Sequence, residues 1–507
     1  MIVRRVVSRR HLMHGGAAAL ALAALAACSS PPPTTAPAPT QAPAKPAATT
    51  APAAAPTTAP AAPPTAAPAA PTAAPTAAAT TVPAAKPATS GERVQIKFAY
   101  HVWPGWEDAV KNVIKAYEEK QPRVSVKFEL MDYAQLAPTL TPRFAAKDPP
   151  DVVHGDSGVP WVEQKLMIDL RDLIKRDNVD LTKLGKTLPN GQLLGDPAQY
   201  GLPLYVTGGL IYMNKTLFDK YGVPLFKPGY TMDQFADAVL KLTRDKAGKS
   251  PSDSGFDPKS VVHYGANAPV SQLTEPFVTN FGGKYWNDDV TKSELTNADT
   301  AAYFRWVNDL ACKKQALLTP QPSQQAATDP FVSQRVAISV AGEWQTSLYQ
   351  KIEDFDWDMA SAPAGKSGYP QGHHVYAASN TLGLPKDSKR QDDGWDFLKH
   401  FIYDRFAQLQ VGRSLGPALI EVAASKDFLD LKKGKRGPTP ENAAWAYKEM
   451  SEHGSMEFAK GWGRNQTKWS PIWSDFQLSL LTLCDKDVNS LLPEYEKKLT
   501  DALNAKA

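Results

Sequence analysis

The strongest constraint on the fold is a proline-rich segment near the N-terminus. Of the 44 prolines in the chain, 17 lie in residues 31–90, where nearly all of the remaining residues are alanine or threonine. Proline removes backbone hydrogen-bond donors, and such small side chains bury too little apolar surface to offset the entropy lost on folding. Residues 29–91 are therefore predicted to be a disordered linker, and the residues after it must form the globular fold.

Residues 1–28 have the pattern of an export signal. A basic start is followed by an apolar run, residues 17–27, that is too short to span a bilayer. The run ends in LAACS, which resembles the lipobox of bacterial lipoproteins, where Cys28 would carry the lipid. Residues 8–12 resemble the twin-arginine motif, and the export route stays open. We expect a lipid-anchored protein on the outer face of the cytoplasmic membrane, extracellular or periplasmic.

The distribution of charge argues against nucleic acid as a partner. The whole chain carries a formal charge of +4, but the leader holds four arginines without an acid and the linker holds two lysines. Residues 91–507 therefore carry a net charge of −2. A domain without a basic excess lacks the electrostatic attraction that phosphate backbones require.

Two cysteines remain for the exported domain once Cys28 is assigned to lipid. Cys312 and Cys484 could pair as a disulfide or stay as buried thiols. Because a large hydrophobic core needs no covalent staple, the sequence favours thiols, and pairing stays open.

The globular part begins with alternating strand and helix patterns. Residues 94–100 and 124–130 alternate as strands do, and residues 106–117 place their apolar side chains on one helical face. A third strand is expected at residues 149–153. This order predicts an α/β fold with a largely parallel sheet and helices on both faces.

Five motifs, in order over residues 94–402, carry a family resemblance. They are PDVV (150–153) with LMIDL (166–170), YGLPLY (200–205) with LIYMNKTLF (210–218), NFGGKY (280–285), FVSQRVAI (331–338) with GEW (342–344), and GWDFLKHFI (394–402). Together they resemble the family 1 extracellular solute-binding proteins of ABC importers. Met167 and Gln334 depart from the family pattern at positions where glycine is common.

The resemblance implies a two-lobe, type II-like periplasmic-binding-protein fold with the ligand cleft between the lobes. Crossover strands are expected near residues 201–205, 361–365 and 415–418. The implied lobes are 92–204 with 361–415 for the N-terminal lobe, and 205–360 with 416–507 for the C-terminal lobe. The implied function is capture of a small polar solute, foremost a mono- or oligosaccharide, by hinge closure and delivery to the permease subunits. The protein is expected to be a monomer.

Aromatic side chains are the main candidates for ligand contact. All twelve tryptophans lie beyond residue 100, and an indole face suits the C–H faces of sugars or a quaternary cation. The candidates lie at the ends of predicted strands, at turns and in a late aromatic segment, because clefts of α/β folds form at the carboxyl ends of strands. They are Trp103, Trp106, Asp156, Tyr205, Trp286, Trp344, His374, Tyr376 and Trp473.

Enzyme-like motifs are present, but none has the context its chemistry needs. GDSG (155–158) follows a strand of an α/β pattern rather than an all-β barrel, and GKS (248–250) lacks the leading glycine of a phosphate loop. Adjacent histidines such as His373 and His374 point to opposite faces of a strand, which does not suit one metal ion. We expect no catalysis, metal or cofactor. The alternatives left open are a surface hydrolase of carbohydrate and a sensor subunit that binds a protein partner.

Overall fold

The computed structural model describes residues 93–101, 106–155, 160–185, 196–320, 328–370 and 372–505. The export signal, Cys28, the linker, Trp103 and Asp156 lie outside the described residues. Within those ranges, no helix has both the length and the apolar character needed to cross a membrane.

Twelve strands are present in the described part of the chain. They are β1 (Val94–His101), β2 (Val124–Met131), β3 (Val153–His154), β4 (Leu202–Asn214), β5 (Arg244–Asp245), β6 (Val261–Asn267), β7 (Leu317–Leu318), β8 (Val336–Gly342), β9 (Trp357–Ala360), β10 (Val375–Gly383), β11 (Gly416–Pro417) and β12 (Gly454–Ser455).

Sixteen α-helices lie between and after these strands in the same described ranges. They are α1 (Trp106–Lys120), α2 (Tyr133–Ala145), α3 (Pro160–Glu163), α4 (Arg171–Arg176), α5 (Lys215–Lys220), α6 (Met232–Leu242), α7 (Glu275–Asn280), α8 (Ala298–Asn308), α9 (Thr346–Tyr349), α10 (Gln391–Tyr403), α11 (Arg405–Gly412), α12 (Ile420–Ala423), α13 (Lys426–Lys432), α14 (Pro440–Glu452), α15 (Gln466–Thr482) and α16 (Val488–Leu503). Four short turns of helix matter below: η3 (Ser271–Thr274), η4 (Asp309–Lys313), η5 (Glu343–Gln345) and η6 (Ala459–Gly463).

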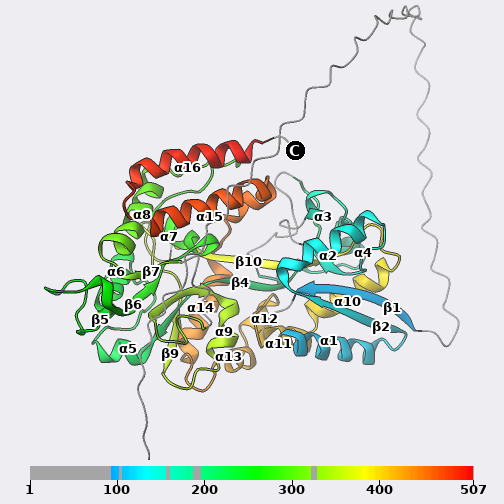
Figure 1. The fold of residues 1–507 in the computed structure, drawn as a ribbon. Helices are drawn as coiled ribbons and strands as arrows, with labels where there is room; N and C mark the ends of the chain where they lie inside the picture. Colours follow the sequence, from blue (N-terminus) through cyan, green and yellow to red (C-terminus); the bar gives the residue numbers. More distant parts are fainter. Residues whose placement is uncertain are drawn as a thin grey trace, which may run out of the picture. The chain divides into compact units, whose positions relative to one another are not determined.

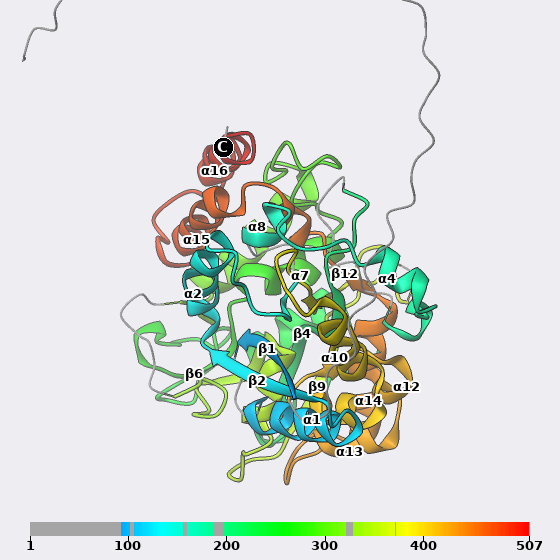
Figure 2. The same ribbon diagram turned by 90° about the vertical axis from the view of Figure 1, so that its right-hand side faces the viewer.

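The N-terminal strand–helix–strand unit forms as its hydrophobic periodicity predicts. β1 and β2 pair in parallel over their full length, and α1 lies against them (Figure 2). The apolar stripe of α1, from Trp106 through Val110, Val113 and Tyr117, is buried. Burial of this stripe, rather than helix propensity alone, stabilises α1.

The long strand β4 organises the ten-stranded sheet. The strand order is β12-β10-β4-β8-β6-β5, and β9 and β11 also pair with β4. β4 and β10 lie side by side in Figure 1. The prediction of a largely parallel sheet holds for the segment it was drawn from, because β1 pairs in parallel with β2 and Phe98 forms a parallel bridge to Val152. It does not extend to the ten-stranded sheet, which is mixed: all four neighbours of β4 run antiparallel to it, whereas β12 with β10 and β8 with β6 are parallel. The sequence pattern identifies strands, but it does not tell whether a strand runs parallel or antiparallel to its neighbours in the sheet.

The pairing changes along β4. Its first half pairs with β10 and β11, and its second half pairs with β8 and β9. The three expected crossover segments coincide with the start of β4, the residues directly after β9, and β11. The lobe boundaries themselves stay a prediction.

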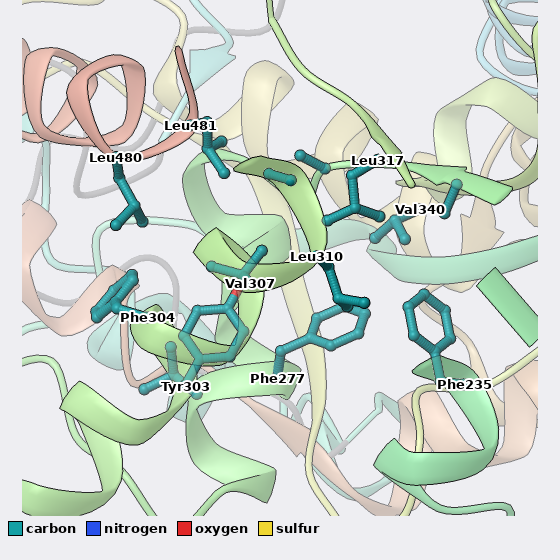
Figure 3. Close-up of a cluster of buried hydrophobic side chains, with 14 of the residues drawn as sticks. Phe235, Phe277, Tyr303, Phe304, Val307, Leu310, Leu317, Val340, Leu480 and Leu481 are labelled. Atoms are coloured by element: carbon teal, nitrogen blue, oxygen red, sulfur yellow. The ribbon is translucent and has the colours of Figure 1, made fainter. Parts of the chain in front are cut away.

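The buried apolar side chains form separate clusters. We call the cluster drawn from residues 96–205 and 382–422 the N-terminal core. We call the clusters drawn from residues 206–377 and 428–503 together the C-terminal core; part of it, around Phe235, Phe277 and Tyr303, is shown in Figure 3.

Cys312 and Cys484 form a disulfide, so the preference for free thiols was wrong. Cys312 lies in η4, which packs against α15, and Cys484 follows the end of α15. This packing brings the two Cα atoms to 5.3 Å, within the range that a disulfide spans. Nothing in the local sequence of either cysteine carries that information.

Candidate ligand-binding site

A cavity of about 290 Å³ lies beside the middle of β4. Its walls come from β4, β10, η3, η5, η6, α15 and the start of α2. The lining residues are Tyr133, Tyr205, Thr207, Ser271, Gln272, Trp344, Tyr376, Ala378, Asn380, Leu415, Phe458, Trp462, Gln466, Trp469, Ser470, Trp473 and Ser474.

Strand alternation accounts for one wall of the cavity. Tyr205 and Thr207 of β4 line the cavity, whereas Val206 between them lines a different one. In the register of the sheet, Asn380 of β10 lies opposite Tyr205, and Ala378 lies opposite Thr207. Because side chains alternate along a strand with a period of two, the two strands present one continuous face to the cavity.

Trp344 enters the cavity from the end of β8. The indole lies over Gly342, where an added Cβ would be 2.1 Å from the ring. Only glycine therefore leaves room for this ring position. Trp344 is half-buried and packs against the N-terminal core, although the strand that precedes it, β8, belongs to the C-terminal core.

The opposite wall is a helical stripe. Gln466, Trp469 and Trp473 of α15 follow one another at spacings of three and four residues, which place their side chains on one helical face. Trp462 lies in the preceding turn η6, separated from α15 by Asn465 in the left-handed conformation, and lines the cavity as well. Trp469 and Trp473 are 1% and 2% exposed, and Trp469 Nε1 donates to the Gly461 and Arg464 carbonyl oxygens at 3.0 Å. Trp462 is only partly buried.

Two buried histidines, His101 and His154, lie close to the cavity residues Tyr205 and Tyr133. The hydroxyl of Tyr205 lies 3.4 Å from His101 Nε2, and the ring of Tyr133, which is 57% exposed, packs edge-on against His101 at 5.1 Å. The His154 ring lies 5.0 Å from that of His101. Burial first, and then His154, lower the pKa of His101 well below its usual value, so His101 is neutral at physiological pH.

A buried carboxyl supports the segment that carries Phe458. Glu275 at the start of α7 accepts hydrogen bonds from the backbone N–H of Glu457 (2.9 Å) and of Phe458 (3.0 Å). Burial raises the pKa of Glu275 to about 8, against the opposing effect of these hydrogen bonds. The carboxyl therefore fixes the position of one wall residue without placing a charge in the cavity.

The cavity offers neutral chemistry. None of its described lining residues is charged; the polar groups are hydroxyls and carboxamides among aromatic rings. Within the described ranges, no group of three or more His, Cys, Asp and Glu side chains is arranged to hold a metal ion. The arrangement can stack a flat apolar face and exchange hydrogen bonds with an uncharged polar ligand.

The candidates chosen from sequence are distributed unevenly around this cavity. Tyr205, Trp344, Tyr376 and Trp473 line it. Trp103 and Asp156 lie outside the described residues.

Three further candidates do not line the cavity. Trp106 is fully buried in the N-terminal core, and Trp286 is buried in the C-terminal core, where its Nε1 donates to the Phe458 carbonyl at 3.1 Å. His374 is half-buried, and its backbone N–H and C=O are bonded to the Asn280 side chain. Strand ends and turns bring side chains to a cleft or to a core, and the sequence pattern does not distinguish the two.

Several residues that line the cavity were not predicted, among them Tyr133, Gln272, Asn380, Trp462 and Gln466. For Gln466 a signal was present, because it continues the spacing of Trp469 and Trp473 toward the N-terminus. Trp462 lies in a separate helical turn, to which this spacing does not apply. Tyr133 lies two residues after the end of β2, a strand-end position like those of the predicted candidates.

Known structures share this fold. An ABC substrate-binding protein of Listeria monocytogenes in complex with cycloalternan has a TM-score of 0.64 at 19% identity and covers 82% of this chain and 100% of that chain. The cyclic α-maltosyl-1,6-maltose binding protein of Arthrobacter globiformis has a TM-score of 0.61 at 16% identity and covers 81% and 99%. The fold is thus the α/β fold of periplasmic binding proteins, as the sequence analysis predicted.

Sequence comparison places the chain within a family. The model of the bacterial extracellular solute-binding proteins matches residues 103–402, and the chain belongs to this family. A diacetylchitobiose-binding protein of Streptomyces coelicolor is 23% identical over 305 residues, which cover 59% of this chain and 67% of the relative. An uncharacterised ABC transporter extracellular-binding protein of Pyrococcus horikoshii is 23% identical over 319 residues, which cover 62% and 70%.

The predicted class of function is confirmed at this level. The chain is a solute-binding protein of an ABC transporter. Its family consists of binding proteins rather than enzymes, so the prediction that the chain is not an enzyme is also confirmed.

Proposed function

We propose that the protein binds a neutral carbohydrate, a mono- or oligosaccharide, in the aromatic cavity beside β4. The observation that carries this proposal is the lining itself, in which aromatic rings alternate with uncharged hydrogen-bonding groups. Sugars combine polarised C–H faces, which stack on indole, with hydroxyls that bond to amides and phenols. The absence of charge among the described lining residues favours a neutral sugar over a phosphorylated, acidic or cationic solute.

The relatives support the same ligand class. One is named for diacetylchitobiose, one was solved with cycloalternan, and another is named for a cyclic maltosyl-maltose. At identities of 23% and below, these names support carbohydrate as a class and do not indicate which sugar this chain binds.

Different lining residues would have different roles. Trp344 and Trp462 are half-buried with ring surface at the cavity, so we assign them the stacking contacts. Tyr205 and Asn380, opposite each other on β4 and β10, would hydrogen-bond to hydroxyls. Trp473 and Tyr376 are almost fully buried and would shape the wall. Trp103 and Asp156 remain candidates.

Capture and delivery follow from the crossing segments. Closure of the two lobes about β4, residues 361–374 and β11 would enclose the sugar, and the closed form would dock on the permease subunits. A micromolar dissociation constant, about −8 kcal/mol, is within reach of two stacks and several hydrogen bonds and still permits release. We further propose that Cys28 carries lipid and that residues 29–91 tether the binding domain at the outer face of the membrane.

The test is thermal unfolding of the full-length chain with maltotriose, mannotriose, diacetylchitobiose, an oligogalacturonate and choline. A ligand at 100 times its dissociation constant stabilises the folded state by about 2.7 kcal/mol. We expect stabilisation by at least one neutral sugar, lost in Trp344→Ala and retained in Trp306→Ala, a half-buried tryptophan away from the cavity. Stabilisation by choline alone or by the oligogalacturonate alone would refute a neutral sugar site.

A further inference from the structure

A buried ion pair lies directly behind Trp344. Glu343 and Lys432 side chains are both 0% exposed, and Glu343 Oε1 lies 2.9 Å from Lys432 Nζ. The same oxygen accepts a hydrogen bond from the Tyr447 hydroxyl at 2.7 Å. Lys432 belongs to α13 and Tyr447 to α14, so two helices of the C-terminal core hold the side chain that precedes Trp344.

The backbone at this point is held from β4 as well. The Tyr212 hydroxyl lies 2.7 Å from Thr346 Oγ1 and 3.5 Å from the carbonyl oxygens of Gly342 and Glu343. The short turn η5, which carries Trp344, is therefore fixed at its start by β4, α13 and α14. Consecutive residues of a tight helical turn point in different directions. Glu343 points into the core and Trp344 toward the cavity.

Stability alone is a poor explanation for this pair. Removing two charges from water costs as much as their attraction returns unless the remaining hydrogen-bonding capacity is satisfied. Within the described residues, Glu343 Oε2 has no hydrogen-bond partner. Lys432 also lies over the rings of Phe428 (5.3 Å) and Tyr447 (5.6 Å), which contribute weaker attraction. Two well-packed apolar side chains could fill the same space without the desolvation cost.

We propose that the Glu343–Lys432 pair is a positioning device that fixes the direction of the Trp344 indole over Gly342 in the ligand-free protein. A charge pair has one favourable geometry in a dry interior, whereas apolar side chains permit several. Neither residue lines the cavity. The consequence for affinity rests on the proposed function, but the positioning does not.

The test uses the full-length chain labelled with 5-fluorotryptophan, with the Trp344 ¹⁹F resonance assigned from Trp344→Phe. The variants are Lys432→Met, which leaves a buried charge, and the double variant Glu343→Gln with Lys432→Met. The double variant removes both charges and keeps a partner for Tyr447. The matched control is Thr243→Val, which removes a buried hydroxyl bonded to Val239 O at 2.8 Å, away from the cavity.

We expect the double variant to recover most of the unfolding midpoint that Lys432→Met loses. Its Trp344 resonance should nevertheless shift and broaden, and maltotriose or mannotriose should bind about threefold to tenfold more weakly, as expected for loss of one well-aligned stack. The control should leave the Trp344 resonance unchanged.

An unchanged Trp344 resonance in the double variant would overturn the proposal, whatever its stability. If Lys432→Met does not fold, the double variant decides the question alone. If the wild-type chain binds none of the sugars but the resonance still moves, the proposed ligand class fails while the positioning role stands.

Discussion

Glu275→Gln should change the pH dependence of stability in a direction set by burial. Burial raises the pKa of Glu275 to about 8 in the folded protein, whereas the ordinary value of 4.5 applies to the unfolded chain. The folded state therefore holds a proton that the unfolded state releases. The stability contributed by this proton is fully present below pH 4.5 and is lost as the pH rises through about 8.

The magnitude follows from the two pKa values. The folded and unfolded pKa values differ by about 3.5, and each pKa unit is worth about 1.36 kcal/mol. Ionisation of Glu275 should therefore lower the free energy of unfolding by on the order of 5 kcal/mol above pH 8. A glutamine at position 275 carries no charge at any pH. It accepts only one of the two backbone hydrogen bonds from Glu457 and Phe458, however, and this should cost about 1–3 kcal/mol. Glu275→Gln should be less stable than wild type at pH 5 and more stable at pH 9.

The assay is urea unfolding of the full-length wild-type and variant chains at intervals from pH 5 to pH 9. The measured quantity is the difference in unfolding free energy between the two chains, which cancels the titration of all other groups. Asp288→Asn, at a carboxylate whose side chain is 92% exposed, is the control and should give a nearly constant difference. A constant difference for Glu275→Gln across the same range would refute the argument from burial.

Three further predictions concern stability and the cavity wall. Reduction of the Cys312–Cys484 disulfide, which closes a separation of 172 residues, should lower the unfolding free energy by about 5 kcal/mol, measured by urea unfolding with and without dithiothreitol. Gly342→Ala should displace the Trp344 indole and weaken sugar binding at least about tenfold by calorimetry, since its Cβ would meet the ring at 2.1 Å. Asp177→Asn should lower the free energy of unfolding by about 1–2 kcal/mol at pH 7. A hydrogen bond from Arg176 is the main cause that holds the Asp177 pKa below its usual value, so the loss should shrink on acidification, as urea unfolding at pH 7 and pH 3 would show.

The sequence predicted those parts of the fold that local periodicity determines. β1, α1 and β2 begin where the apolar pattern places them, and the YGLPLY segment at 200–205 begins the strand that crosses the sheet. The direction of the strands around β4 was not predictable, because an apolar run has the same pattern in a parallel and an antiparallel neighbour. The pairing of Cys312 and Cys484 depends on helix packing between distant segments.

The cavity was predicted in part for a related reason. Trp344 was identified because it follows a strand within a family motif, and it lies at the cavity. Trp286 was predicted because it follows the double-glycine turn, but its ring is buried and does not line the cavity. Its indole instead donates a hydrogen bond to the carbonyl of Phe458, which does line the cavity. Trp462 falls in a short turn rather than at a strand end, and Asn465 separates that turn from α15, so no periodicity in the sequence indicates that Trp462 lines the cavity. Exposure is a property of the packed fold, and it separates indoles that can stack from indoles that support a wall.

The position of the cavity along β4 bears on the closure proposed above. Leu204 and Tyr205 pack into the N-terminal core, whereas Val206 and Leu210 pack into the C-terminal core, so β4 passes from one core to the other between Tyr205 and Val206. Tyr205 is also the residue at which β4 faces the cavity. Trp344 reaches the cavity from a strand of the C-terminal core and packs against the N-terminal core. If the lobes close about β4 as proposed, a ligand that contacts Tyr205 and Trp344 would touch residues supplied from both sides of this point, and its contacts would be strongest in one arrangement of the lobes. Differential affinity of this kind is what binding needs in order to drive closure.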